Sequence, residues 1–327
     1  MQRLNSILLV SVFIIPISIR GQLLPVLGAQ RAGTATAQFL KIGVGARASA
    51  MGESFVAVAN DASALYWNPA GIAQFDGNQI IVAHTRWLAD IQHEFVGAVY
   101  RLSTADAVGL SFTSLQTDDM PVTTEFHPTG NGDYFRFGDI AVGVSYARRM
   151  TSQFSFGATV RYFNETMDKV HMQGVVVDLG TYYWTELGTS RFSAVVTNFG
   201  NQVSPTGEIV LQNGQAVRSF QEFSPPTLFR FGFAFEPINE ETNSLTTSIQ
   251  LNHPNDNSEN VSLGAEYRWM HTLFLRAGYK LNVDEQQLSA GIGLLTTVES
   301  FGVGVDYGYN AFERLGGVHR ISLSLRL

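Results

Sequence analysis

The sequence predicts an all-β protein, namely a transmembrane antiparallel β-barrel of about fourteen strands with an N-terminal helical plug segment. One observation behind this prediction is composition: only 15% of the 327 residues are charged, whereas a soluble domain usually has about 25%. The other is that apolar and polar residues alternate with a period of two from residue 79 onward. A barrel with one face in lipid and the other facing an internal lumen explains both observations.

The N-terminus predicts export. Arg3 supplies a positive charge, residues 4–19 form a mostly apolar run that Pro16 interrupts, and small residues precede Gln30. This pattern is typical of a cleaved signal peptide over residues 1–29, and the run is short for a membrane-spanning helix. A retained anchor is the alternative. The chain has no cysteine, which excludes a lipoprotein anchor and disulfides.

The charge balance excludes some partners. The chain has a net charge of −7, and cleavage of the signal peptide would remove Arg3 and Arg20 but no acidic residue. The mature chain would therefore be more acidic still. An acidic balance argues against a nucleic-acid partner and against electrostatic docking on anionic lipid.

Residues 30–78 form the predicted plug segment. They contain the stretch "DASALYWNPAG", which begins at Asp61. Asn60 or Asp61 fits the N-cap of a helical turn, and Pro69 is expected to end that turn at the residue before it. A helical turn satisfies its own backbone hydrogen bonds except at its ends, so it can lie inside a barrel without pairing with the wall.

Several side chains of this segment are predicted to line or gate the lumen: Phe39, Leu40, Phe55, Leu65, Tyr66, Trp67, Asn68, Pro69 and Gly71. Tyr66 and Trp67 give the turn a large apolar face. Gly43, Gly45 and Gly52 are expected to let the preceding backbone pack closely against the barrel wall. The segment either closes the barrel purely for stability or has a gating or ligand-binding role, and the sequence leaves both alternatives open.

Residues 79–327 form the predicted barrel. The last strand, "HRISLSLRL", places Ile321, Leu323 and Leu325 on one face and Arg320 and Ser322 on the other. No stretch after the signal peptide offers about eighteen uninterrupted apolar residues. If the mature chain is in a membrane, it therefore crosses as strands, and only a closed barrel satisfies their backbone groups in lipid. The fourteen predicted strands are 79–88, 93–102, 106–116, 134–147, 152–164, 172–186, 190–199, 227–236, 243–252, 259–269, 272–281, 286–297, 299–309 and 316–327.

The connections between these strands alternate in length. Short turns are predicted at 103–105, 148–151, 187–189, 270–271 and 298, with a longer one at 237–242, and long loops at 116–133, 200–226, 252–258 and 309–315. Outer-membrane barrels have short periplasmic turns and long extracellular loops, so the C-terminus is expected on the periplasmic side. Aromatic residues near strand ends are expected in the interfacial girdles: Trp87, Tyr100, Tyr146, Trp184, Tyr267, Trp269 and Tyr307.

The sequence has no catalytic signature. It has no G-x-S-x-G elbow, no Walker A motif and no cysteine nucleophile, so we expect no enzyme and no cofactor. Two possible metal sites are less favoured than solvated loop residues with no metal. His84 and His93 flank the first predicted hairpin, and Asp118, Asp119 and Asp133 share one loop that is otherwise read as a solvated polar loop.

The N-terminal third carries the most specific motif. Residues 37–74, "AQFLKIGVGARASAMGESFVAVANDASALYWNPAGIAQ", resemble the opening of the PorV/PorQ family of bacterial outer-membrane proteins, which are relatives of FadL-type fatty-acid transporter barrels. Residues 84–100, 123–163 and 195–200 resemble the family as well. The resemblance implies a fourteen-stranded barrel with an N-terminal segment in the lumen or its periplasmic mouth. It also implies a role in the type IX secretion system and no catalytic residues.

Three functions follow from the residues and the resemblance together. The first is a secretion-system barrel of the outer membrane whose long loops bind a translocon or an exported cargo protein. Asp118, Asp119, Phe126, Phe220 and Phe223 are the loop residues predicted to meet such a partner. The second is a FadL-like transporter that holds a lipid or detergent-like hydrophobic molecule in its lumen, and the third is a structural subunit of an outer-membrane complex.

Overall fold

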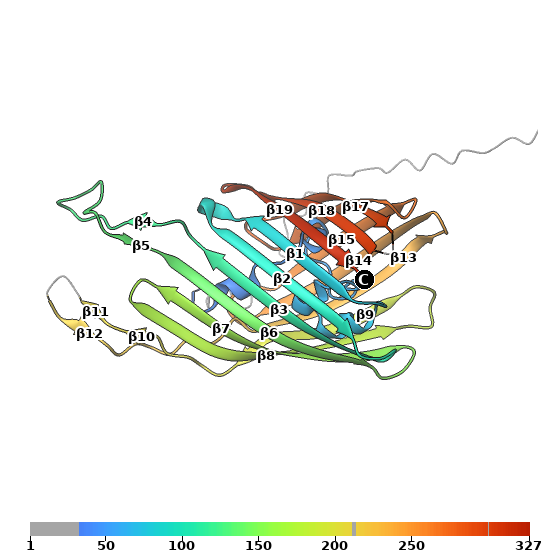
Figure 1. Cartoon of the computed structure of the whole chain (residues 1–327), viewed down its shortest axis with the longest axis horizontal. Helices are drawn as coiled ribbons and strands as arrows, with labels where there is room; N and C mark the ends of the chain where they lie inside the picture. The colour runs from blue at the N-terminus through green and yellow to red at the C-terminus, as the bar shows by residue number, and fades with distance from the viewer. Residues whose placement is uncertain (1–32, 211–213, 300) are drawn as a thin grey trace, which may run out of the picture.

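The computed structural model describes residues 33–210, 214–299 and 301–327, and the predicted signal peptide, residues 1–29, lies outside them. Within the described chain, fourteen long strands form one closed antiparallel barrel (Figure 1). They are β1 (Gln79–Arg86), β2 (Gln92–Arg101), β3 (Asp106–Gln116), β6 (Phe137–Arg149), β7 (Phe154–Met167), β8 (Val170–Trp184), β9 (Arg191–Gly200), β13 (Leu228–Asn239), β14 (Asn243–Pro254), β15 (Asn260–Trp269), β16 (Leu273–Leu281), β17 (Leu288–Val298), β18 (Phe301–Phe312) and β19 (Gly316–Arg326).

The barrel closes where its first strand meets its last. β1 pairs with β19 in antiparallel register, from Gln79 opposite Arg326 to Arg86 opposite His319. Every other strand pairs with its neighbour in the chain, and β9 pairs with β13 across the longest connection. Closure leaves no free sheet edge, which is the condition for strands to cross lipid. The predicted barrel and its strand count are confirmed.

The period of two sorts side chains between lipid and lumen as predicted. On β19, Ile321 and Leu323 point outward and are about half exposed, while Arg320 and Ser322 point inward and are buried. In the middle of the strand the outward residues lie opposite outward apolar partners on both neighbouring strands; Leu323, for example, lies between Val82 and Val305. The outer face of β1, β18 and β19 is therefore apolar in its middle, and His84, Arg86 and His319 lie toward one end.

The two ends of the barrel differ in the length of their connections. At one end, called here the short-turn end, the connections are tight and the C-terminus follows β19. At the other, the long-loop end, residues 117–136 carry the hairpin β4 (Met120–Pro121) and β5 (Tyr134–Phe135). Residues 201–227 carry β10 (Thr206–Gly207), β11 (Ile209–Val210) and β12 (Ala216–Val217). Figure 1 shows these two loops as separate projections on the left.

One predicted long loop is wrong. Residues 309–315 were expected to form a long loop, but β18 continues to Phe312 and β19 begins at Gly316, so the connection is a tight turn. Gly316 has a positive φ of 91°, which only glycine adopts at low cost. Tyr309 and Phe312 thus belong to strand β18 and not to a loop.

Residues 33–78 contain the helical part of the chain. They form η2 (Gln38–Lys41), α1 (Ala46–Ala50), α2 (Ala64–Trp67) and η3 (Pro69–Ala73), drawn in blue inside the barrel in Figure 1; a further short turn, η4 (Leu88–Asp90), joins β1 to β2. Among the residues that the structure describes, no helix is long and apolar enough to span a membrane.

The N-terminal segment runs along the lumen from one end to the other. Near its start, Ala35 forms a bridge with Ser224 of the loop between β9 and β13, at the long-loop end. At its finish, the backbone of Asn78 exchanges hydrogen bonds with Leu327 at the short-turn end. The path explains why the segment contacts strands from most of the barrel circumference.

The predicted girdle residues do not all face lipid. Tyr100 and Trp269 are exposed on the outer face as expected. Trp184 instead points inward: its Nε1 donates to Gln74 Oε1 at 2.9 Å, and the guanidinium of Arg191 lies 4.8 Å from its ring centroid. The prediction for Trp184 is wrong because position near a strand end does not say which face a residue occupies.

The outward apolar face makes a testable prediction. We expect Leu323→Arg to destabilise the folded barrel in lipid by about 2–4 kcal/mol if the site lies near the bilayer midplane, because a charge there faces hydrocarbon. Unfolding in urea, followed by the heat-dependent shift of the folded barrel on a gel, measures the change. The matched control is Leu187→Arg in a short turn, where the side chain is 81% exposed and should tolerate charge. Equal loss in both variants would contradict the assignment of the lipid face.

Candidate functional site: the lumen segment and the long-loop end

The stretch that begins at Asp61 folds as a short helical turn. Asp61 Oδ1 accepts a hydrogen bond from the backbone N–H of Ser63 at 2.9 Å, which orders the chain just before α2. The helix α2 ends at Trp67, and Asn68 is extended, with φ −159° and ψ 104°. Pro69 accounts for that end, because proline disfavours helical geometry at the residue before it. The predicted end of the turn is confirmed, whereas the predicted cap is wrong, because the N-cap of α2 is Ser63 and its side chain makes no capping bond.

Asn68 fixes the turn to the barrel wall. Its Oδ1 accepts from the backbone N–H of Ala70 at 3.0 Å and so caps η3, which begins with Pro69. Its Nδ2 donates to the carbonyl of Val56 at 2.9 Å and to that of Thr181 on β8 at 3.0 Å. A fully buried amide with all these bonds satisfied holds one geometry, because breaking any of them leaves a buried polar group unpaired.

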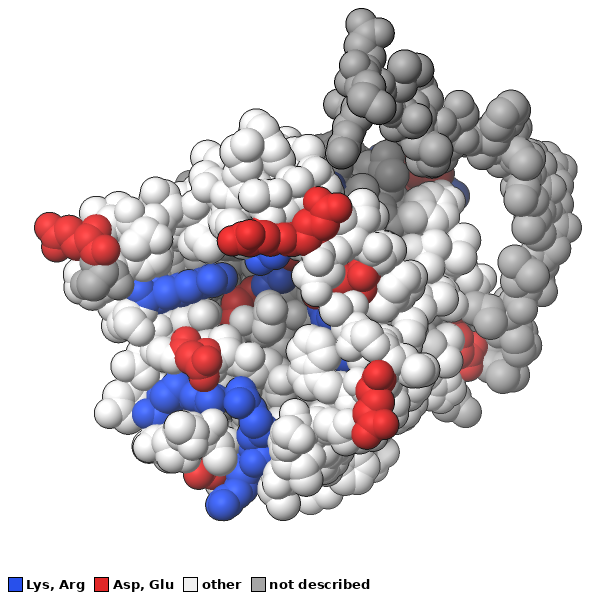
Figure 2. Space-filling view, turned by 90° about the vertical axis from the view of Figure 1, so that its right-hand side faces the viewer, with Lys and Arg blue, Asp and Glu red and all other residues white. Residues whose placement is uncertain are grey.

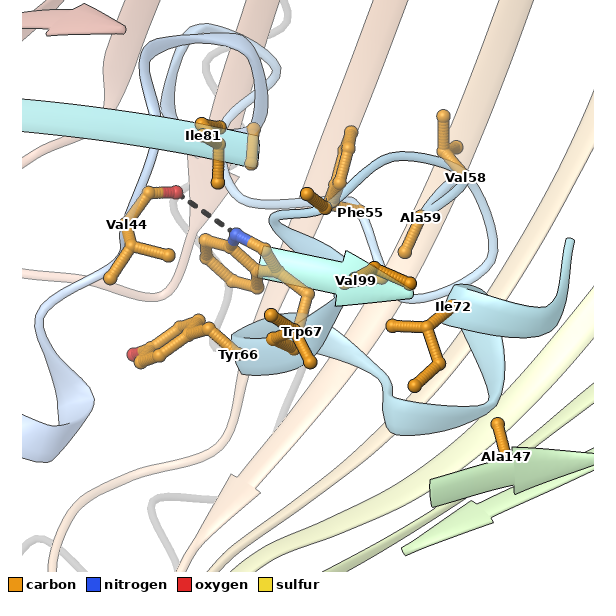
Figure 3. Close-up of a cluster of buried hydrophobic side chains, with 14 of the residues drawn as sticks. Val44, Phe55, Val58, Ala59, Tyr66, Trp67, Ile72, Ile81, Val99 and Ala147 are labelled. Carbon is orange, nitrogen blue, oxygen red and sulfur yellow. Dashed lines mark hydrogen bonds between the residues drawn. The ribbon is translucent and has the colours of Figure 1, made fainter. Parts of the chain in front are cut away.

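The aromatic tip of the turn is the centre of a buried cluster (Figure 3). Trp67 Nε1 donates to the carbonyl of Val44 at 3.0 Å, and its ring meets those of Tyr66 and Phe55 edge to face. The guanidinium of Arg230, on β13, lies 5.3 Å from the Trp67 ring centroid. The tip therefore binds both the earlier part of the segment and the wall.

Glycines in the wall make room for the segment. A Cβ at Gly157 would overlap Pro69 and Ala70, and one at Gly308 would lie 2.8 Å from the carbonyl oxygen of Ala46. The same holds for other inward glycines whose Cβ would meet the segment, namely Gly97, Gly109, Gly180, Gly232, Gly264, Gly278 and Gly291. These residues come from nine different strands, so the segment touches bare backbone around much of the lumen.

Only one of the three glycines predicted to approach the wall does so. Gly52 has φ +64°, and a Cβ there would lie 2.9 Å from the backbone nitrogen of Tyr279 on β16. Gly43 instead packs against Glu53 and Trp67 within the segment, and Gly45 lies near Ser63. The expectation for these two is corrected: they let the segment fold on itself.

Four ion pairs join the segment to the wall or to a loop at its rim, and one of them is the 3.5 Å pair of Asp76 with Arg101 on β2. Lys41 binds Asp256 at 2.7 Å, Arg47 binds Glu266 at 2.8 Å, and Glu53 binds Lys280 at 2.6 Å. Burial alone would raise the pKa of Glu53, but the charges of Lys280 and Arg320 outweigh it and hold that pKa below its usual value. The segment is thus anchored by charge as well as by packing.

The nine predicted lumen residues all lie buried in or beside this segment. Phe55, Leu65, Tyr66 and Trp67 belong to the cluster at the aromatic tip, while Phe39 and Leu40 join a second cluster with wall residues such as Phe163. A Cβ on Gly71 would lie 2.5 Å from the carbonyl oxygen of Ala59, so glycine is required there. That these residues gate the lumen stays a prediction.

The five predicted loop residues fall on two separate loops. Phe220 and Phe223 border an apolar pocket of about 520 Å³ at the long-loop end, whose other walls are Met167 and Met172 near β7 and β8 and residues 35–38 of the segment. Phe126 is 88% exposed on the other loop. Asp118 and Asp119 are exposed there too, and Asp119 pairs with Arg136 at 2.9 Å.

The two metal alternatives receive no support in the described chain. His84 points outward and pairs with Glu94, whereas His93 points inward and is buried, because residues offset by one position across a hairpin lie on opposite faces. The described residues contain no group of three or more metal-binding side chains.

Sequence reasoning missed the charged groups inside the lumen. Arg47 bridges Asp61 and Glu266, and Arg276 bridges Glu266 and Asp306, so these residues form one network. Elsewhere Arg320 is fully buried against the ring of Trp87 and bonds to Asn310. The available signal was that Glu266, Arg276, Asp306 and Arg320 occupy the polar positions of the period-two pattern.

Comparison with protein families identifies the chain. The family model described as type IX secretion system protein PorV matches residues 27–255. The chain belongs to the PorV family. No curated protein sequence matches it significantly. As a PorV-family member, this chain is an outer-membrane barrel of the type IX secretion system. Its partners are therefore membrane lipid and other components of that system.

Solved structures show the same fold. The CymD monoaromatic hydrocarbon channel matches with a TM-score of 0.57 and 15% identity, over 87% of this chain and 96% of that one. The toluene transporter TbuX of Ralstonia pickettii matches with 0.55 and 13%, over 86% and 97%. The toluene transporter TodX of Pseudomonas putida matches with 0.56 and 14%, over the same shares. At such identity the likeness establishes the barrel architecture alone.

Removal of the aromatic tip tests how the segment is held. We expect Trp67→Ala to loosen it, because losing a buried tryptophan costs about 3–5 kcal/mol. Trypsin should then cleave after Lys41 and Arg47, which ion pairs protect in the parent protein. The control is Trp269→Ala, which removes the same side chain from the outer face. Unchanged resistance of residues 33–74 in the Trp67 variant would contradict the account.

Proposed function

We propose that this PorV-family barrel binds another protein of the type IX system, either the translocon or an exported cargo, through its long-loop end. The family match indicates which secretion system the partner belongs to, and the long-loop end offers an exposed surface for binding it. Binding residues usually lie on loops held by a rigid scaffold, and here the two largest loops project from the same rim.

The exposed apolar side chains of these loops are the observation that carries the proposal. Phe126 is 88% exposed and Tyr134 67% exposed on the first loop, and Val210 is 63% exposed on the second. Aromatic residues of this kind dominate the binding energy of protein interfaces when a partner buries them. Outward apolar residues on the strands face lipid, but these lie on loops outside the barrel wall.

Site-specific cross-linking tests this proposal. A photoreactive amino acid at Phe126 should cross-link in native membranes to the translocon or to a secreted cargo, identified by mass spectrometry. The same group at Leu187, an equally exposed position at the short-turn end, serves as the control. Phe126→Ser combined with Tyr134→Ser should reduce co-purification of that partner at least about tenfold if two anchors are lost. Equal cross-linking at both positions, or none at Phe126, would argue against the proposal.

The apolar pocket favours a second candidate, transport of a hydrophobic small molecule. Its volume of about 520 Å³ and its walls of Phe220, Phe223, Met167 and Met172 suit an apolar ligand. The solved neighbours named above are hydrocarbon channels and toluene transporters. Native mass spectrometry of the purified barrel distinguishes the two: a barrel that carries lipid or detergent and has no protein partner supports transport, whereas a stable protein complex supports the first proposal.

A further inference from the structure

The short-turn end contains a polar cavity that the proposed partner surface does not use. It has a volume of about 490 Å³, within the usual range for ligand sites. The turn around Asp61 forms one wall, and side chains of β13 to β19, with Arg191 of β9 and Ile81 of β1, form the others. Figure 2 looks at this end and shows a hollow bordered by basic and acidic side chains.

Every carboxylate that lines this cavity forms an ion pair with an arginine of the chain. Asp61 binds Arg47 at 2.6 Å, Glu266 binds Arg47 and Arg276, and Asp306 binds Arg276 at 2.7 Å. The remaining lining carboxylate belongs to Glu236 and pairs with Arg191 at 3.2 Å. Three arginines, Arg47, Arg191 and Arg276, thus pair with the four carboxylates, so each acidic group has an arginine partner.

Two arginines of the same cavity have no such partner. Arg268 and Arg326 line it but take part in no ion pair or side-chain hydrogen bond within the described chain, and the Nε of Arg268 is buried without a partner. The lining thus has five arginines against four carboxylates, in a chain whose net charge is −7. The unmatched charge is positive and lies at an opening to solvent.

We propose that this cavity binds an oxyanion group, a carboxylate or a phosphate, of a ligand that approaches from the short-turn end. A guanidinium offers a planar pair of N–H donors that matches either group, and each unpaired arginine presents such a pair. The short-turn end faces the periplasm in outer-membrane barrels, so the ligand comes from that compartment. The bound group would lie beside Asp61 and thus next to the turn that closes this end of the lumen.

Thermal unfolding of the full barrel in detergent tests the proposal. Succinate and inorganic phosphate are titrated separately at constant ionic strength, with chloride as the balancing anion. We expect a saturable rise in the midpoint temperature with at least one of them, because a ligand that binds only the folded state stabilises it. A response to succinate alone assigns a carboxylate ligand, and a response to phosphate alone assigns a phosphate.

Variants of Arg268 and Arg326 test whether these two arginines bind the anion. Arg268→Gln combined with Arg326→Gln should raise the half-saturating concentration at least about tenfold, because charge-assisted bonds to both guanidiniums are lost. Neither substitution breaks an ion pair, and if the double variant does not fold, each single variant should show a smaller increase. Arg148→Gln is the matched control, since Arg148 lies on the outside of the same end. No saturable response in the parent protein, or the same response in all folded variants, would overturn the proposal.

Discussion

A chain segment that is not a strand can fill a closed barrel only where the wall leaves room for its backbone. In this protein that room comes from inward glycines on nine strands, and the helical turns of residues 38–73 lie against them. The turns satisfy most of their own hydrogen bonds, and Asn68 supplies one of the bonds to the wall that they do not. Close contact with bare wall backbone, together with side-chain hydrogen bonds and ion pairs, therefore joins the segment to the barrel strands without strand pairing.

This contact also organises the two ends. Because the segment starts beside Ser224 and finishes beside Leu327, it contributes a wall to the apolar pocket at the long-loop end and a wall to the polar cavity at the short-turn end. The two sites differ in character: one has aromatic and methionine side chains, and the other has arginines and carboxylates. A change in the segment would alter both at once.

The strands were predictable from sequence because a period of two is a local property, and the alternation of Ile321 with Ser322 states directly which side faces lipid. The end of the helical turn was predictable for the same reason, from Pro69. Contacts across the lumen were not, since Lys41 with Asp256 and Glu53 with Lys280 join residues more than two hundred positions apart. Trp184 shows the same limit: its place near a strand end was visible, but its neighbour Gln74 was not.

A disulfide between segment and wall tests the central claim most directly. The chain has no cysteine, so a pair introduced at Ala57 and Gly232 is unambiguous; a Cβ at position 232 would lie 3.4 Å from that of Ala57, close to the spacing of a disulfide. Because a Cβ at position 232 would also lie 2.6 Å from Cγ2 of Val56, Val56→Ala accompanies both pairs. Ala57→Cys with Gly232→Cys should then cross-link under mild oxidation in the folded barrel, as peptide mapping without reductant would show. Ala57→Cys with Gly317→Cys, on the outer side of β19, should not. Free thiols in the first folded variant, or equal cross-linking in both, would contradict the placement of the segment in the lumen.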